Sequence, residues 1–221
     1  MKKTLLMLLS LGLVATTLDA QDSDNGRSLA PSLGLNVSKF FEEGVEGSES
    51  LVCPCLGVEA VLHDQGPVQL SSGLWYMRSG SNYKFGEGGG GEGGSYSIET
   101  REVLTYINVP AEARYEFGTG NVKPFVRGGG MLGLLLSAKS KTTTNFNGNE
   151  NKNETDIKNQ KKSANFGLLL GGGVSFPLGK YRGVAGVRYV IGLSNIVKNA
   201  EAPTAKTRDL LFSFGVAFPM P

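Results

Sequence analysis

The sequence predicts an all-β protein, an eight-stranded antiparallel up-and-down transmembrane β-barrel. Eight segments of about 9–13 residues each alternate apolar and polar side chains, as barrel strands do. The connections between these segments alternate between long and short. After the first twenty residues, no apolar run is long enough for a membrane-spanning helix.

The N-terminal residues have the layout of a secretory signal peptide, which we expect to comprise residues 1–20. Two lysines precede a short apolar run from Leu5 to Val14, and small residues follow as far as Ala20. Cleavage after Ala20 leaves residues 21–221 as the outer membrane β-barrel domain. No cysteine lies near this position, so a lipid anchor is not expected there.

Alternation of apolar and polar residues places the eight expected strands. The clearest segment is INVPAEARYEF, where every second residue from Val109 onward is apolar or aromatic and Glu112, Arg114 and Glu116 lie opposite. Leu135 departs from the alternation of its segment. The expected strands are 31–40, 55–63, 68–78, 107–117, 126–138, 165–178, 181–193 and 210–219.

The connections are long, short, long, short, long, short and long along the chain. They are 41–52, 64–67, 79–102, 118–123, 139–164, 179–180 and 194–209. In an up-and-down barrel, alternate connections lie at the same end, so all the long ones gather at one end. Outer membrane barrels have this asymmetry, with long extracellular loops and short periplasmic turns.

Two long connections have an unusual composition. FGEGGGGEGG, residues 85–94, lacks the Lys-Ser/Thr of a phosphate-binding loop, and we interpret it as a mobile, water-exposed loop. Residues 139–164 are rich in Asn and Lys and nearly free of apolar side chains, which predicts a flexible surface loop. The alternatives are that the first loop grips a ligand, and that the second touches acidic sugars or lipid phosphates.

Charged side chains on the polar face of the strands fit the interior of a small membrane barrel. Such a barrel turns its apolar face to lipid, and with eight strands its lumen is nearly filled by side chains. We expect these charges to pair and plug the lumen, with glycines on the same face leaving room for them. The expected lumen charge network is Glu59, Glu112, Arg114, Glu116, Arg127, Arg182 and Arg188.

Aromatic residues on the apolar face fall near the short-turn end of the expected strands. We interpret them as an aromatic girdle at the periplasmic lipid interface. The alternative is that they are core aromatics of a soluble sandwich. The expected lipid-interface aromatics are Tyr115, Phe117, Phe176, Tyr181 and Phe218.

Three segments resemble strands of the PorT-like outer-membrane β-barrel family, which is abundant in the Bacteroidota. LTYINVPAEARYEFG is similar to that family's YLEIPLLLKY, VKPFVRGGGMLGLLLSAK to its PYLEAGPYLGYLLSAK, and VAGVRYVIGLSNI to its LEARYNLGLTNI. The resemblance covers most of residues 32–218. It implies an eight-stranded barrel in the outer membrane, and most members have no assigned activity. This chain departs from the pattern at Arg127, where the family carries an acid, and after Phe218, where Pro-Met-Pro follows.

The residues indicate no catalytic, cofactor-binding or metal site. The single histidine, His63, has Asp64 beside it but no evident serine partner. Glu112 and Glu116 are better explained by a salt-bridge network than by the carboxylate pair of a glycosidase. The C-x-C pair at 53–55 is too sparse for a zinc site, and we interpret it as two small residues at a strand entrance, with an oxidised pair left open.

The expected function is a structural or surface-interaction role in the outer membrane, through the long extracellular loops. We expect a monomer without enzymatic activity or cofactor, whose partners are outer membrane lipid, the insertion machinery and an unspecified extracellular or envelope protein. A formal net charge of +2 gives no nucleic-acid footprint. One alternative is a soluble periplasmic β-barrel that binds an apolar ligand among inward-facing aliphatics. Another is a membrane-embedded enzyme that depends on His63 or Glu112.

Overall fold

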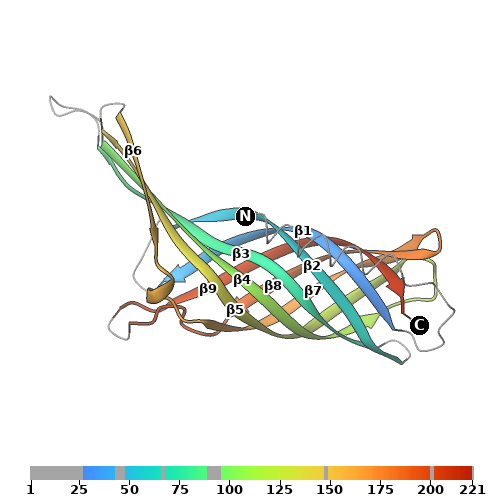
Figure 1. The fold of residues 1–221 in the computed structure, drawn as a ribbon. Coiled ribbons are helices and arrows are strands. Elements are labelled where there is room, and N and C mark those ends of the chain that lie inside the picture. The colour runs from blue at the N-terminus through green and yellow to red at the C-terminus, as the bar shows by residue number, and fades with distance from the viewer. Residues whose placement is uncertain are drawn as a thin grey trace.

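The computed structural model describes residues 27–42, 48–65, 68–88, 96–146, 149–199 and 202–220, so the expected signal peptide lies outside the described residues. Eight strands form a closed antiparallel up-and-down barrel, as predicted (Figure 1). These strands are β1 (Ser28–Glu42), β2 (Ser48–Gln65), β3 (Val68–Gly88), β4 (Tyr96–Glu116), β5 (Lys123–Phe146), β7 (Ala164–Leu178), β8 (Tyr181–Gly192) and β9 (Ala205–Pro219).

The barrel closes between its first and last strands. β1 pairs with β9 from Ser28↔Pro219 to Glu42↔Ala205. β4 and β5 pair along their whole length, and the N-terminal half of β5 pairs with β7 on its other side. Closure satisfies the backbone groups of every barrel strand, which is what a bilayer requires of a β protein.

The strands are longer than predicted at the long-connection end. The expected loops over 79–102 and 139–164 are wrong, because β3, β4 and β5 continue through residues 79–88, 96–102 and 139–146. A further strand, β6 (Asn149–Asp156), pairs with Lys139–Phe146 of β5. Of the glycine-rich stretch, Phe85–Gly88 belong to β3, and residues 89–95 lie outside the described residues.

These additional residues form a polar sheet that projects beyond the barrel, at the upper left of Figure 1. We call this sheet the extension. Gly80, Ser81 and Tyr83 are buried at its base, and farther out its strands have water on both sides, so they lack the apolar–polar alternation that predicts a strand. The extension consists of Ser48–Ser50, Gly80–Gly88, Tyr96–Val103, Lys139–Phe146 and Asn149–Asp156.

The two connections that flank β7 and β8 at this end bond to each other. The first contains a short 3-10 helix, η1 (Lys158–Gln160). The backbone N–H of Lys162 donates to the carbonyl of Ile196 at 2.8 Å, and that of Lys198 donates to Gln160 at 2.9 Å. Beneath them lies a buried cluster that we call the aromatic cluster. Its members are Phe40, Tyr83, Leu104, Tyr106, Leu135, Ala138, Ile157, Ile196 and Ala205.

Leu135 belongs to this cluster, which explains its departure from the predicted pattern. It points inward like Arg127, eight residues before it, and both faces of the barrel wall are apolar at this depth. Cys53 and Cys55 also point inward, from within β2 rather than at its entrance, and both are free and buried. Between Ser50 and Leu56 the β2–β3 ladder gains one residue on β2, a bulge at which Pro54 is tolerated.

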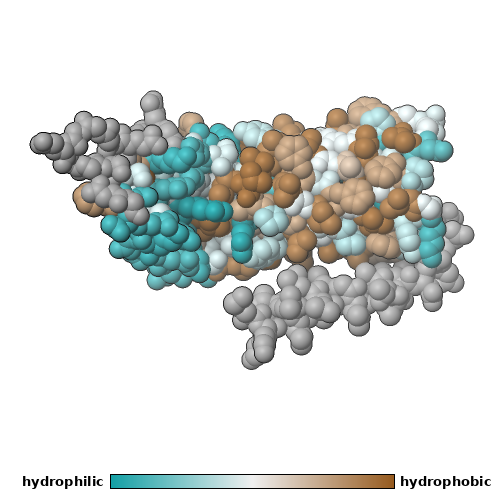
Figure 2. Space-filling model, turned by 90° about the horizontal axis from the view of Figure 1, so that it is seen from above, coloured by the Kyte–Doolittle hydropathy of each residue, from teal (hydrophilic) through white to brown (hydrophobic). Residues whose placement is uncertain are grey.

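The outer surface of the barrel wall is apolar. Large exposed side chains include Leu33, Leu56, Leu134, Leu170 and Phe212, one from each of five strands. Figure 2 shows hydrophobic side chains over most of the wall on one face, between the hydrophilic extension and a short hydrophilic rim at the other end. This arrangement is the inverse of a soluble barrel with an apolar cavity.

No helix in the described part of the chain is long and apolar enough to cross a membrane.

Candidate functional site

Four charged residues from four strands meet in the middle of the barrel, and we call them the inner charge cluster. They are Glu59 on β2, Glu112 on β4, Arg127 on β5 and Arg188 on β8. Period-2 alternation turns each of them inward. Each one lies beside a glycine on a neighbouring strand. The pairs are Glu59↔Gly73, Glu112↔Gly129, Arg127↔Gly171 and Arg188↔Gly171.

Both carboxylates of the inner charge cluster contact both guanidinium groups. Arg127 Nη1 lies 3.2 Å from Glu59 Oε2 and 3.2 Å from Glu112 Oε2. Arg188 Nε lies 3.3 Å from Glu112 Oε1, and its Nη2 donates to Glu59. Two positive and two negative charges, nearly excluded from water, therefore compensate one another across the barrel.

A second group of charges, which we call the rim cluster, lies nearer the short turns and centres on Glu116. Arg114 Nη2 is 2.5 Å from Glu116 Oε1, and Ser175 Oγ donates to the same oxygen at 3.1 Å. Arg182 and Lys123 approach Glu116 Oε2 at 3.8 Å and 3.9 Å. One carboxylate thus faces three cations, so the rim cluster carries an excess of positive charge.

The structure therefore brings together all seven residues of the expected lumen charge network, in two groups. Sequence reasoning missed Lys123 and Phe125, which precede Arg127 on the same inward face. The Phe125 ring contacts two guanidinium groups, with Arg114 Cζ at 3.7 Å and Arg127 Cζ at 4.7 Å from its centroid. Starting the strand three residues earlier would have found both residues.

Asp209 is a further buried acid that the sequence did not reveal, because the expected connection 194–209 ended on it. Asn36 Nδ2 donates to Asp209 Oδ1 at 2.8 Å, and Ser79 Oγ donates to the same atom at 2.7 Å. This hydrogen-bonded group lies between the inner charge cluster and the aromatic cluster. At the same depth Cys55, Trp75, Met77 and Leu211 form a small buried apolar cluster.

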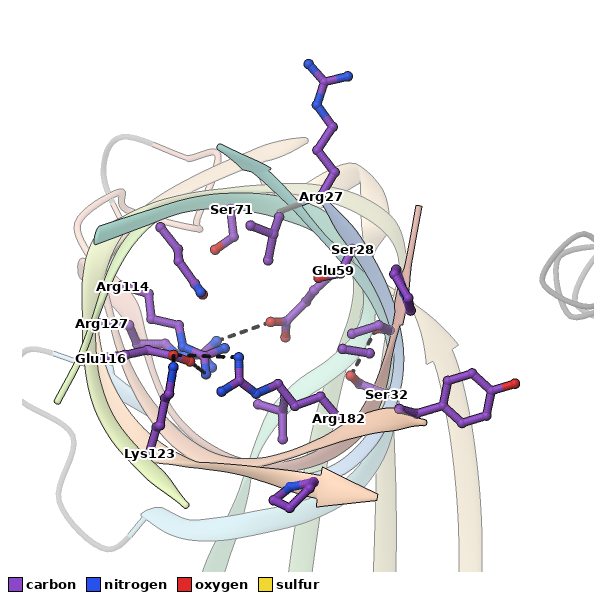
Figure 3. Close-up of a pocket in the computed structure, with 18 of the residues that line it drawn as sticks. Arg27, Ser28, Ser32, Glu59, Ser71, Arg114, Glu116, Lys123, Arg127 and Arg182 are labelled. Carbon is purple, nitrogen blue, oxygen red and sulfur yellow. Dashed lines mark hydrogen bonds and ion pairs between the residues drawn. The ribbon is translucent and has the colours of Figure 1, made fainter. Parts of the chain in front are cut away.

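A cavity of about 600 Å³ opens at the short-turn end of the barrel, beneath the inner charge cluster (Figure 3). Glu59 and Arg127 form its floor, and the rim cluster forms its wall. Its mouth is formed by Thr119–Asn121 and Lys180, which are exposed. The cavity is therefore polar, charged and accessible to water.

The five expected lipid-interface aromatics lie at the short-turn end. Tyr115 and Phe117 pack edge-on with ring centroids 4.9 Å apart, and Tyr181 and Phe218 lie 4.6 Å apart. Phe176 lies 6.4 Å from Phe214. All five are partly or well exposed on the apolar side of the wall.

His63 is exposed near the end of β2, beside the turn to β3. In the ranges that the structure covers, no group of three or more His, Cys, Asp or Glu side chains could hold a metal ion. The interior offers arginines and carboxylates that are already paired with one another. This arrangement can neutralise and position charge, and it presents no activated nucleophile.

A closed barrel with an apolar outer wall and a charged interior defines the class of small membrane-spanning β-barrels. The chain belongs to the family described as outer membrane protein beta-barrel domain, whose model matches residues 9–198. The protein is accordingly located in the bacterial outer membrane, and the alternative of a soluble periplasmic barrel is wrong.

No curated protein matches the chain. Among solved structures, Neisserial surface protein A is 17% identical, with 87% of this chain and 98% of that chain covered and a TM-score of 0.43. OprG from Pseudomonas aeruginosa is 13% identical, with 90% and 99% covered and a TM-score of 0.40. The outer membrane enzyme PagL is 14% identical, with 87% and 99% covered and a TM-score of 0.36.

Proposed function

We propose that this protein is a non-conducting, non-catalytic barrel that acts at the cell surface through its extension. The observation that carries the proposal is the projection of a folded, water-exposed sheet beyond a barrel whose interior holds the inner charge cluster and the aromatic cluster. The short turns lie at the opposite end, which in outer membrane barrels is the periplasmic one, so the extension is extracellular.

The two faces of the extension differ in chemistry. Residues paired across an antiparallel sheet lie on the same face, so the pairs Tyr96↔Phe146, Phe85↔Ile98 and Thr100↔Thr142 share one side. This face continues the inner side of the barrel wall, and its aromatic rings are exposed. We call it the aromatic face of the extension. It comprises Phe85, Tyr96, Ile98, Thr100, Thr142, Thr144, Phe146, Asn151 and Asn153.

The opposite face carries charged pairs. Lys84 Nζ is 2.9 Å from Glu49, Lys139 Nζ is 2.5 Å from Glu154, and Lys152 Nζ is 2.9 Å from Glu150. Each of these pairs satisfies its own charges. The aromatic face instead presents rings, hydroxyls and amides to water, which favours it as the contact surface for a partner.

The experiment measures how strongly an array of immobilised glycans and polypeptides retains vesicles that carry the purified wild-type protein or one of two variants. The double variant Tyr96→Ser/Phe146→Ser alters the aromatic face, and Lys141→Ser/Lys152→Ser alters the charged face as a matched control. We expect at least one immobilised glycan or polypeptide to retain the wild-type protein. The affinity of the first variant for it should be about tenfold lower. Retention equal to that of empty vesicles, or equal loss in both variants, would contradict the proposal.

Five finer assignments accompany this function. We propose that the chain belongs to the PorT-like, Bacteroidota-type subgroup, supported by the three similar segments, and that residues 1–20 are a cleaved signal peptide, supported by their layout. We further propose a monomer inserted by the outer membrane insertion machinery. The aromatic residues at the short-turn end contact outer membrane lipid in this proposal, and the seven charged residues plug the lumen.

A further inference from the structure

The cavity at the short-turn end is lined by far more positive than negative charge. Its only acids among the described lining residues are Glu59 and Glu116. The cationic side chains in its lining are Arg27, Arg114, Lys123, Arg127, Lys180 and Arg182. Figure 3 shows several of these side chains converging on the space from different strands.

The inner charge cluster does not remove this excess. The positive charges of Arg127 and Arg188 are balanced by the negative charges of Glu59 and Glu112, so this cluster has no net charge. The imbalance therefore arises nearer the mouth, where Glu116 alone faces Arg114 at 2.5 Å and two further cations at 3.8–3.9 Å. Within the described residues, the Nε atoms of Arg114 and Arg127 are buried without a hydrogen-bond partner.

The side chains that approach Glu116 from farthest away are also the most accessible. The side chain of Lys123 is 34% exposed and that of Arg182 is 38% exposed, against 8% for Glu116. Their remaining N–H donors face the cavity rather than a second carboxylate among its lining residues. Several cations around a recess with low-dielectric walls concentrate a positive potential in it.

We propose that this cavity binds a small oxyanion, a carboxylate or phosphate group, that enters from the periplasmic side. Guanidinium groups present two parallel N–H donors that match the oxygens of either group, and the lysines add mobile point charges. A volume of about 600 Å³ accommodates a small metabolite or the anionic end of a larger molecule. The inference is independent of the role of the extension, which lies at the other end of the barrel.

Calorimetric titration of the folded, detergent-solubilised protein with inorganic phosphate and with succinate tests the proposal. We expect saturable binding of at least one anion, and the anion that binds identifies the group the site takes. The variant Lys123→Gln/Arg182→Gln should weaken this binding at least about tenfold, because it removes one or two charge-assisted hydrogen bonds to the anion. Lys141→Gln/Lys152→Gln removes the same charge from the extension and should leave the affinity unchanged.

Heat-dependent electrophoretic mobility verifies that each variant is folded before titration. If the first variant fails this check, Lys180→Gln at the exposed mouth takes its place, and we expect it to lower the anion affinity several-fold. Absence of saturable binding of both anions would overturn the proposal. Equal weakening by the cavity variant and the extension control would also overturn it, because binding would then follow overall charge rather than this cavity.

Discussion

Glu112 is the most deeply buried carboxylate of the inner charge cluster and the rim cluster, with 2% of its side chain exposed. It contacts both Arg127 and Arg188, so its removal leaves two guanidinium groups with Glu59 as their shared counter-charge. We predict that Glu112→Gln lowers the free energy of unfolding by roughly 3–5 kcal/mol, the usual cost of breaking a buried ion pair. Urea unfolding in detergent micelles measures this change. Glu154→Gln, on the exposed Lys139–Glu154 pair, should change nothing measurable, and equal effects of the two variants would contradict the prediction.

Glu154 allows a separate test of the exposed charge pairs. A hydrogen bond from Lys139, together with its positive charge, lowers the pKa of Glu154 below its usual range. A carboxyl group stabilised as the anion keeps its charge to lower pH, so this pair loses its attraction only as the pH falls through that lowered pKa. We predict that carboxyl chemical shifts give Glu154 a depressed pKa, and that Lys139→Met raises it. The same midpoint in both proteins would show that the pair does not form in solution.

The three consecutive glycines of β5 show how an element accommodates the charges of its neighbours. A Cβ on Gly129 would lie 2.0 Å from the carbonyl oxygen of Ala111 and 2.9 Å from Glu112 Cα, whereas one on Gly130 would meet nothing closer than 3.9 Å. We predict that Gly129→Ala destabilises the barrel by about 1–3 kcal/mol, because backbone must move, and that Gly130→Ala does not. The temperature at which the unboiled electrophoretic band disappears reports the difference. A similar loss of stability in both variants would mean that glycine matters here for its backbone freedom alone.

The aromatics at the short-turn end form packed pairs, one at the end of β4, one between the adjacent strands β8 and β9, and one between β7 and β9 across β8. Such packing is suited to a lipid interface. We predict that a tryptophan placed at Tyr115, in a Trp75→Phe background, is quenched most by lipids brominated near the headgroup. Tryptophan at Leu170, on the apolar wall, is the control and should be quenched most by bromine deeper in the acyl chain. Quenching of both positions at the same depth would remove the case for a girdle.

Apolar–polar alternation predicted the eight barrel strands, because one face of each strand contacts an apolar environment and the other faces the barrel interior. It did not predict the extension, since strands with water on both faces carry no such alternation. The same limit applies within the site. Glu112, Arg127 and Arg188 were recognisable as charges on an inward face, but their pairing depends on register across the barrel, and Asp209 lay beyond the apparent strand end.

Along the whole molecule, the interior changes character from one end to the other. A positively charged cavity opens at the short turns, and the balanced inner charge cluster lies above it. The hydrogen-bonded Asp209 group follows, and then the aromatic cluster under the connections that bond to each other. Charge that would be costly in lipid is therefore compensated inside the wall, while apolar packing occupies the interior at the end that bears the extension.

Two buried groups lie in series along the barrel, and both bear on the proposal that it does not conduct. The inner charge cluster and the aromatic cluster each fill the interior at a different depth, so losing one leaves the other. We predict that the purified protein shows no stable conductance steps in planar bilayers, and that Arg127→Ser, which vacates part of the inner charge cluster, shows none either. Insertion must be verified for both proteins by their heat-dependent mobility. Conductance in the wild-type protein would show that water fills the interior, and conductance in Arg127→Ser alone would show that the aromatic cluster does not seal the barrel.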